Sequence, residues 1–138
     1  MIVPQEIYHP LYEDNEKFII LITGGRGSGK SFNASTFIER LTFEMTPVEK
    51  IVHQILYTRY TMVSAGMSII PEMMEKIDLD GTTKYFKTTK TDIVNKMTKS
   101  RIMFRGIKTS SGNQTAKLKS IQGITTFVCD EAEEWTSE

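Results

Sequence analysis

Cysteine is almost absent from this chain. Its 138 residues contain a single cysteine, Cys129, which excludes an internal disulfide and a multi-cysteine metal site. A chain that does not depend on disulfides suits a reducing compartment, so we expect an intracellular protein. Cys129 itself is expected to be a small apolar residue of a strand.

Long hydrophobic runs are also missing. The longest purely apolar run is Phe18 to Ile22, whereas a membrane-spanning helix needs about 20 apolar residues. Residues 1–6 have neither a basic flank nor an apolar run of signal-peptide length. The sequence therefore predicts neither secretion nor a membrane span.

Net charge is absent too, but the charges are segregated. The formal net charge is +0, and the 39% hydrophobic and 25% charged residues indicate one ordinary globular domain over residues 1–138. Between Lys84 and Lys119 only one acid, Asp92, is present, and after Ser120 there are five acids and no base. The pattern fits a basic face for a polyanion, or lysines that are merely solvated. The basic residues of the first stretch are Lys84, Lys87, Lys90, Lys96, Lys99, Arg101, Arg105, Lys108, Lys117 and Lys119.

What is present is a glycine-rich loop directly after the apolar run Phe18 to Ile22, which we expect to be a buried strand. Gly24, Gly29, Lys30 and Ser31 fill the fixed positions of the phosphate-binding pattern G-x-x-x-x-G-K-[ST]. Glycines let backbone N–H groups surround a phosphate chain, while the lysine reaches the phosphates and the hydroxyl ligates Mg²⁺. The predicted nucleotide-binding loop is Gly24, Gly25, Arg26, Gly27, Ser28, Gly29, Lys30 and Ser31.

The residues around the loop support this interpretation. Apolar residues recur at helical spacing from Ala34 to Met45, so a helix is expected to begin at the loop and to direct its positive end at the phosphates. In residues 1–16, Pro4 and Pro10 are expected to prevent a helix. This lead-in can lie against the base, with Gln5 hydrogen-bonding an adenine edge and Tyr8 stacking on it.

The remaining elements predict an α/β sheet. Residues 50–60 are expected to form its second strand, with Arg59 near the carboxyl end, and a helical stripe runs from Met67 to Ile77 with Pro71 in its first turn. Three short strands within residues 82–108 predict a basic antiparallel meander. Residues 124–129 form an apolar strand that ends in Asp130 and Glu131, as a Walker B element requires for holding Mg²⁺ and polarising water.

Together these motifs resemble the large subunit of a tailed-phage terminase, the ATP-driven motor that packages double-stranded DNA. The resemblance runs through nearly the whole chain, and the order and spacing of its motifs are more specific than any one of them. It rests on the loop Gly24–Ser31 with its internal arginine, on Tyr57–Arg59, on Lys119–Gly123 and on Asp130–Glu134.

The resemblance implies both a fold and a set of roles. The fold is an α/β P-loop NTPase of the additional-strand type, with a mainly parallel core sheet, flanking helices and the basic meander. Lys30 and Ser31 bind phosphates and Mg²⁺, Asp130 holds the metal, Glu131 is the catalytic carboxylate, and Arg26 contacts the γ-phosphate. The implied partners are double-stranded DNA, the portal protein and the small terminase subunit, within a ring homo-oligomer in the host cytoplasm.

The chain departs from the family after Glu131. Family members continue with a coupling motif, the rest of the ATPase sheet and a nuclease domain, so the resemblance covers only the first part of the ATPase half. In the additional-strand fold a strand from later sequence separates residues 18–22 from residues 125–129, and we expect a gap of about 9–10 Å there. A helicase-like ATPase and a catalytically silent nucleotide-binding module remain alternative functions.

Overall fold

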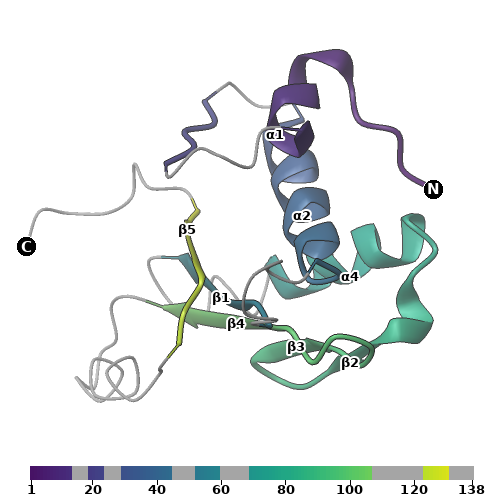
Figure 1. Cartoon of the computed structure of the whole chain (residues 1–138), viewed down its shortest axis with the longest axis vertical. Coiled ribbons are helices and arrows are strands. Elements are labelled where there is room, and N and C mark those ends of the chain that lie inside the picture. Colours follow the sequence, from purple (N-terminus) through teal and green to yellow (C-terminus); the bar gives the residue numbers. More distant parts are fainter. Residues whose placement is uncertain (14–18, 24–28, 45–51, 60–68, 107–122, 131–138) are drawn as a thin grey trace, which may run out of the picture.

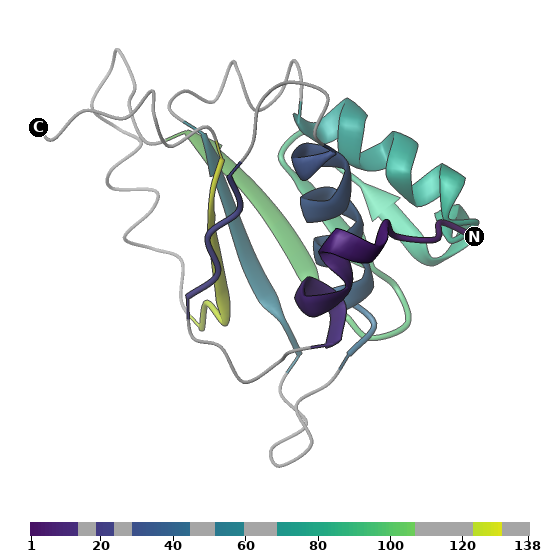
Figure 2. The same cartoon turned by 90° about the horizontal axis from the view of Figure 1, so that it is seen from above.

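The computed structural model describes residues 1–13, 19–23, 29–44, 52–59, 69–106 and 123–130. Within them one five-stranded sheet carries its helices on one face (Figures 1 and 2). The strands are β1 (Gln54–Arg59), β2 (Phe86–Thr88), β3 (Asp92–Asn95), β4 (Arg101–Gly106) and β5 (Thr126–Cys129). The helices are η1 (Glu6–Tyr8), α1 (His9–Glu13), α2 (Lys30–Leu41), α4 (Ile70–Leu79) and η3 (Thr83–Tyr85).

The sheet has a parallel half and an antiparallel half, in the order β2-β3-β4-β1-β5. Strand β1 pairs in parallel with β4 on one side and with β5 on the other. Strand β2 pairs antiparallel with β3, and β3 pairs antiparallel with β4, which confirms the predicted meander. Because β4 belongs to both halves, the meander is a lateral extension of the parallel sheet.

The core lies between the sheet and the helices α2 and α4. Apolar side chains on alternate strand positions, such as Ile55, Ile93 and Ile102, are fully buried against α4 residues such as Met73 and Ile77. Apolar residues on one face of the strands and on one face of α4 therefore pack together in a single cluster. Both helices begin as the sequence predicted, α2 at the glycine-rich loop and α4 with Pro71 in its first turn.

The prediction of a strand at residues 18–22 is wrong for the described residues 19–22. They adopt no regular structure, and the side chains of Ile19 and Leu21 are 80% and 84% exposed. A strand needs a hydrogen-bonded neighbour as well as an apolar sequence. Residues 19–22 pair with none of the described strands, although the outer edge of β5 carries no other described strand.

This outcome also bears on the expected gap beside residues 125–129. The described residues 19–22 form no ladder with β5, so the arrangement that would have contradicted the expectation is not observed. Because residues 19–22 are not a strand, the expected spacing of about 9–10 Å stays a prediction.

The prediction that Pro10 prevents a helix in the first residues is also wrong. Helix α1 contains Pro10 as its second residue. In the first turn of a helix the missing N–H of proline has no intrahelical acceptor to lose, and the fixed φ suits the helix. The short helix turns the lead-in toward α2 (Figure 2).

Candidate nucleotide-binding site

The amino end of α2 carries the described part of the phosphate-binding pattern. Lys30 opens the helix and Ser31 follows it, while Gly29 is the N-cap residue with φ 80°. This left-handed conformation costs glycine little because it has no Cβ. Unpaired N–H groups and the positive end of the helix dipole favour an anion at this point. Residues 24–28, including Arg26, lie outside the described residues.

Asn33 holds the carbonyl group of Gly29 and is itself bonded to Tyr12. The backbone N and the side-chain Nδ2 of Asn33 each donate to Gly29 O, both at 2.9 Å. The Tyr12 hydroxyl lies 3.1 Å from Asn33 O and 3.2 Å from Asn33 Oδ1. Asn33 is buried, and burial is the main cause of the raised pKa of Tyr12. The end of the loop is thereby fastened to helix α1.

Sequence reasoning missed both of these residues. Asn33 follows Gly29 by one helical turn, and that spacing was the available signal for its side-chain bond. Tyr12 is distant in sequence, and its bond to Asn33 depends on how α1 packs against α2.

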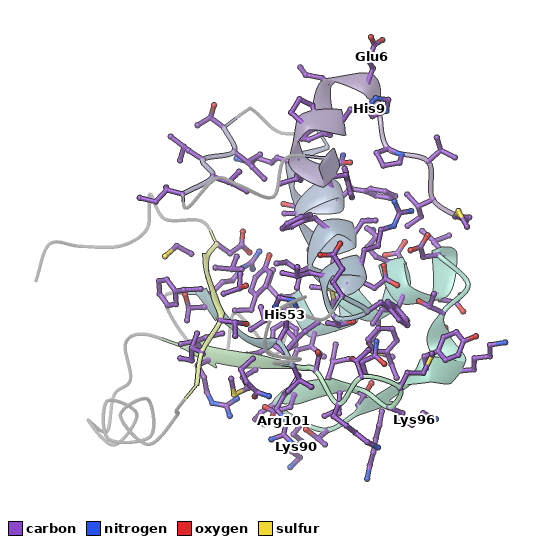
Figure 3. The ribbon with its side chains drawn as sticks, viewed as in Figure 1. Glu6, His9, His53, Lys90, Lys96 and Arg101 are labelled. Carbon is purple, nitrogen blue, oxygen red and sulfur yellow. The ribbon has the colours of Figure 1, made fainter. Side chains whose placement is uncertain are left out.

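The lead-in borders the same glycine. A Cβ placed on Gly29 would lie 3.6 Å from Gln5 Oε1 and 3.8 Å from Tyr8 Cε2. The side chains of Gln5 and Tyr8 therefore approach Gly29, at the start of α2. Their contact with a base stays a prediction. His9 is exposed on α1 (Figure 3), as expected of a surface histidine.

Asp130 follows β5 and is paired with a cation. Its backbone N donates to Thr58 O at 2.9 Å, which continues the parallel pairing of β1 with β5. The register places Arg59 beside it, and Arg59 Nε donates to Asp130 Oδ2 at 2.7 Å. The two side chains are 10% and 16% exposed, so this charge-assisted bond is largely shielded from water.

Tyr57, two residues before Arg59 on β1, is buried. Burial raises its pKa strongly, and the Asp130 charge acts in the same direction. The hydroxyl therefore stays protonated at neutral pH and takes no part as a base.

The start of α2 and the ends of the parallel strands lie at one edge of the sheet. Helix α2 begins at the end of the sheet where β1, β4 and β5 finish (Figure 2). Parallel sheets bind ligands outside the carboxyl ends of their strands. Lys30, Ser31 and Asp130 thus belong to one edge, whereas Glu131 lies outside the described residues.

Ser31 and Asp130 are the described residues at this edge that would hold a magnesium ion bound together with phosphates. In the described part of the chain no three His, Cys, Asp or Glu side chains form a group that could hold a metal. Mg²⁺ does not require such a group, since it is usually held by one or two protein ligands with phosphate oxygens and water. Ser31 and Asp130 supply a hydroxyl and a carboxylate of that kind.

Comparison with known families places most of the chain in one family. Residues 16–138 match the family described as phage terminase large subunit. The chain belongs to this family. The match includes both Lys30 at the start of α2 and Asp130 after β5, and membership places this terminase chain in phage DNA packaging in general terms. A comparison with curated proteins found no match.

None of the helices that the structure describes in this terminase chain is long and apolar enough to cross a membrane.

Proposed function

We propose that this chain binds Mg-ATP at the amino end of α2. In the complete terminase large subunit it hydrolyses the ATP to drive double-stranded DNA into the procapsid. The observation that carries the proposal is the edge shared by the start of α2 and the end of β5 (Figure 2). There the positive end of α2 lies at the edge of the sheet where β5 ends, directly before Asp130.

Each residue then has a defined task. Lys30 contacts the β and γ phosphates, and the backbone N–H groups of residues 24–29 surround them. Ser31 and Asp130 hold Mg²⁺, which neutralises charge on the transferred phosphoryl group. Glu131 orients and polarises the attacking water, and Arg26 stabilises charge developing on the γ-phosphate.

Two hydrogen bonds among the described residues hold groups of the proposed site in position. Asn33 Nδ2 donates to Gly29 O, so the N-cap residue of α2 is held while Lys30 contacts phosphate. Arg59 holds the Asp130 carboxylate at the sheet edge by a 2.7 Å bond. Groups that are oriented before a ligand arrives lose less entropy when it binds.

The proposed fold and partners follow from family membership. We infer an additional-strand P-loop domain whose described helices cover one face of the sheet. We also infer a packaging ring of several copies that meets the portal protein and the small subunit in the host cytoplasm. Membership in the terminase family favours this role over that of a helicase-like ATPase.

Calorimetric titration with Mg-ATP tests the binding site. Lys30→Ala removes the cation directed at the phosphates, and we expect the affinity to fall at least tenfold, which is about 1.4 kcal/mol or more. Glu75→Ala is the matched control, because Glu75 is an exposed side chain on α4 whose carboxylate contacts Lys76 Nζ at 3.7 Å. Equal affinities for Lys30→Ala and the unmodified chain would remove the phosphate-loop assignment.

A turnover assay of the complete motor separates an enzyme from a silent module. Glu131→Gln keeps the shape of the side chain but loses its ability to accept a proton. We expect this variant to bind Mg-ATP normally and to hydrolyse it at least a hundredfold more slowly. Full activity in Glu131→Gln would move the catalytic carboxylate elsewhere, and an unmodified motor without turnover would favour the silent module.

A further inference from the structure

We propose that the meander β2-β3-β4 is a surface that binds the phosphate backbone of double-stranded DNA. The choice of DNA as partner rests on the proposed function, whereas the surface itself follows from the described side chains. We call this surface the basic meander and define it by six cations. They are Lys84, Lys87, Lys90, Lys96, Lys99 and Arg101.

The charge of the basic meander is available to a partner. All six of its cations are exposed. The one acid in this part of the chain, Asp92, is buried and already paired, with Arg105 Nη1 at 2.9 Å and Arg101 Nη1 at 3.4 Å. Asp92 therefore takes up part of the charge of Arg101, whereas none of the five lysines forms an ion pair with a described carboxylate.

The cations are spread along the meander in a way that suits a long polyanion. Lys87 and Arg101 lie on the same face of the sheet, because each is registered with Val94. Lys90 lies in the turn before β3, and Lys96 and Lys99 lie in the turn after it. The four residues of β3 separate these turns by roughly 13 Å, a length over which duplex DNA presents about eight phosphate charges. Figure 3 shows Lys90, Lys96 and Arg101 along one side of the molecule.

The aromatic residues of the meander favour a duplex over a single strand. Proteins that bind single strands stack the bases on exposed aromatic rings. Here the rings of Tyr85 and Phe86 pack edge to face against Phe43, with centroids 5.8 Å and 5.5 Å apart. Phe86 is buried and Tyr85 is half-buried, so the basic meander offers exposed cations to a backbone and neither of these rings as a fully exposed stacking platform.

The basic meander is separate from the proposed nucleotide site. The sheet order places β2 and β3 at one side of β4 and β1, and β5 with Asp130 at the other. Removing charge from the meander is therefore expected to leave Mg-ATP binding unchanged. This separation makes the two proposals testable independently.

The test measures the affinity of the full chain for a fluorescent 30-base-pair duplex over a series of salt concentrations. Each phosphate contact contributes about 0.9 to the slope of log affinity against log salt. The triple variant Lys87→Gln, Lys90→Gln and Lys96→Gln is expected to make that slope shallower by about 2–3. The matched control replaces the same three lysines with arginine and should keep the slope. Thermal melting and a Mg-ATP titration accompany each variant.

The outcomes separate the alternatives. An unchanged slope in the glutamine variant would overturn the proposal and leave the lysines as charges that protect the edge strand β2. Tighter binding to a single strand of equal length, or to vesicles with one-fifth phosphatidylserine, would overturn it in favour of that partner. If the duplex results hold but the unmodified chain binds no Mg-ATP, the proposed function fails while the surface stands.

Discussion

At the scale of single residues, Asn33 connects the phosphate-binding pattern to the rest of the chain. Its Nδ2 donates to Gly29 O at 2.9 Å, while its own oxygens lie within hydrogen-bond distance of the Tyr12 hydroxyl. The three groups form a link from α1 through α2 to the loop. Gly29 was identified by its motif, but a motif does not reveal which side chains hold it.

Replacing Asn33 tests this link. Asn33→Ala removes a buried donor and leaves Gly29 O with fewer partners, so we expect the free energy of unfolding to fall by about 1–3 kcal/mol. The Mg-ATP affinity should fall as well, because Gly29 is less firmly held. Chemical denaturation and calorimetry measure the two effects. Tyr12→Phe removes the hydroxyl alone and should give a smaller change, whereas an Asn33→Ala variant with unaltered affinity would make the link purely structural.

At the scale of elements, the turn between β3 and β4 is fastened to the end of α2. Asn95 Nδ2 donates to Thr42 Oγ1 at 3.1 Å, and Thr98 Oγ1 donates to Thr42 O at 2.6 Å. To close this turn Lys99 adopts φ 67°, a left-handed conformation that strains a residue with a Cβ. The strain is tolerated because the surrounding bonds determine the path of the chain.

Relieving this strain should stabilise the protein. Lys99→Gly places at φ 67° the residue that adopts it most readily, and we expect the free energy of unfolding to rise by about 0.5–1 kcal/mol. Lys96→Gly is the matched control, since it removes one cation from the same turn at a residue without positive φ. That control should lower stability by a similar amount. Chemical denaturation compares the two, and equal effects would show that no strain is stored at Lys99.

The helices and strands also show which elements the local sequence could predict. Helices α2 and α4 and all strands of the meander were predicted because each has its own periodicity and turn residues. Residues 19–22 have an equally clear apolar pattern but form no strand. Strand formation also requires a paired neighbour, and residues 19–22 pair with none of the described strands.

At the scale of the whole molecule, one buried polar network joins the first residues to both helices. Arg40 on α2 pairs with Asp80, the residue after α4, at 3.1 Å, and the backbone N of Ile2 donates to Asp80 Oδ1 at 2.9 Å. Glu39 beside them is fully buried and accepts a 2.6 Å bond from Thr82 Oγ1. The pKa of Glu39 is raised to about 7, chiefly by burial; the hydrogen bond from Thr82 opposes this rise, and the neighbouring Asp80 carboxylate adds to it.

The pKa of Asp80 moves in the opposite direction. Burial alone would raise it, but hydrogen bonds from Arg40, Glu39 and Ile2 outweigh burial and hold the pKa at about 2. Below pH 7 Glu39 is therefore the partner that carries the proton. This contribution of Asp80 to stability is present above its ordinary pKa of 3.8 and is lost as the pH falls through about 2.

The network predicts a pH dependence of stability. Because the folded chain holds the Glu39 proton up to about pH 7 and the unfolded chain releases it near 4.5, stability should fall as the pH rises between these values. The loss is expected to be roughly 3 kcal/mol at most. Glu39→Gln keeps the donor without the titration and should flatten the curve. Urea denaturation from pH 5 to pH 8 measures it, and equal slopes in both proteins would contradict the assignment to Glu39.

The sequence by itself determined what depends on local chemistry. The phosphate-binding pattern, the helix after it, the meander and the apolar strand before Asp130 were all readable, because spacing and side-chain type decide them. Only the tertiary structure decided which distant groups meet: Arg59 with Asp130, Tyr12 with Asn33, and Ile2 and Arg40 with Asp80. It also decided that residues 19–22 stay outside the sheet. Such pairings depend on how elements pack and which edges find partners, and local sequence does not encode the location of a neighbour.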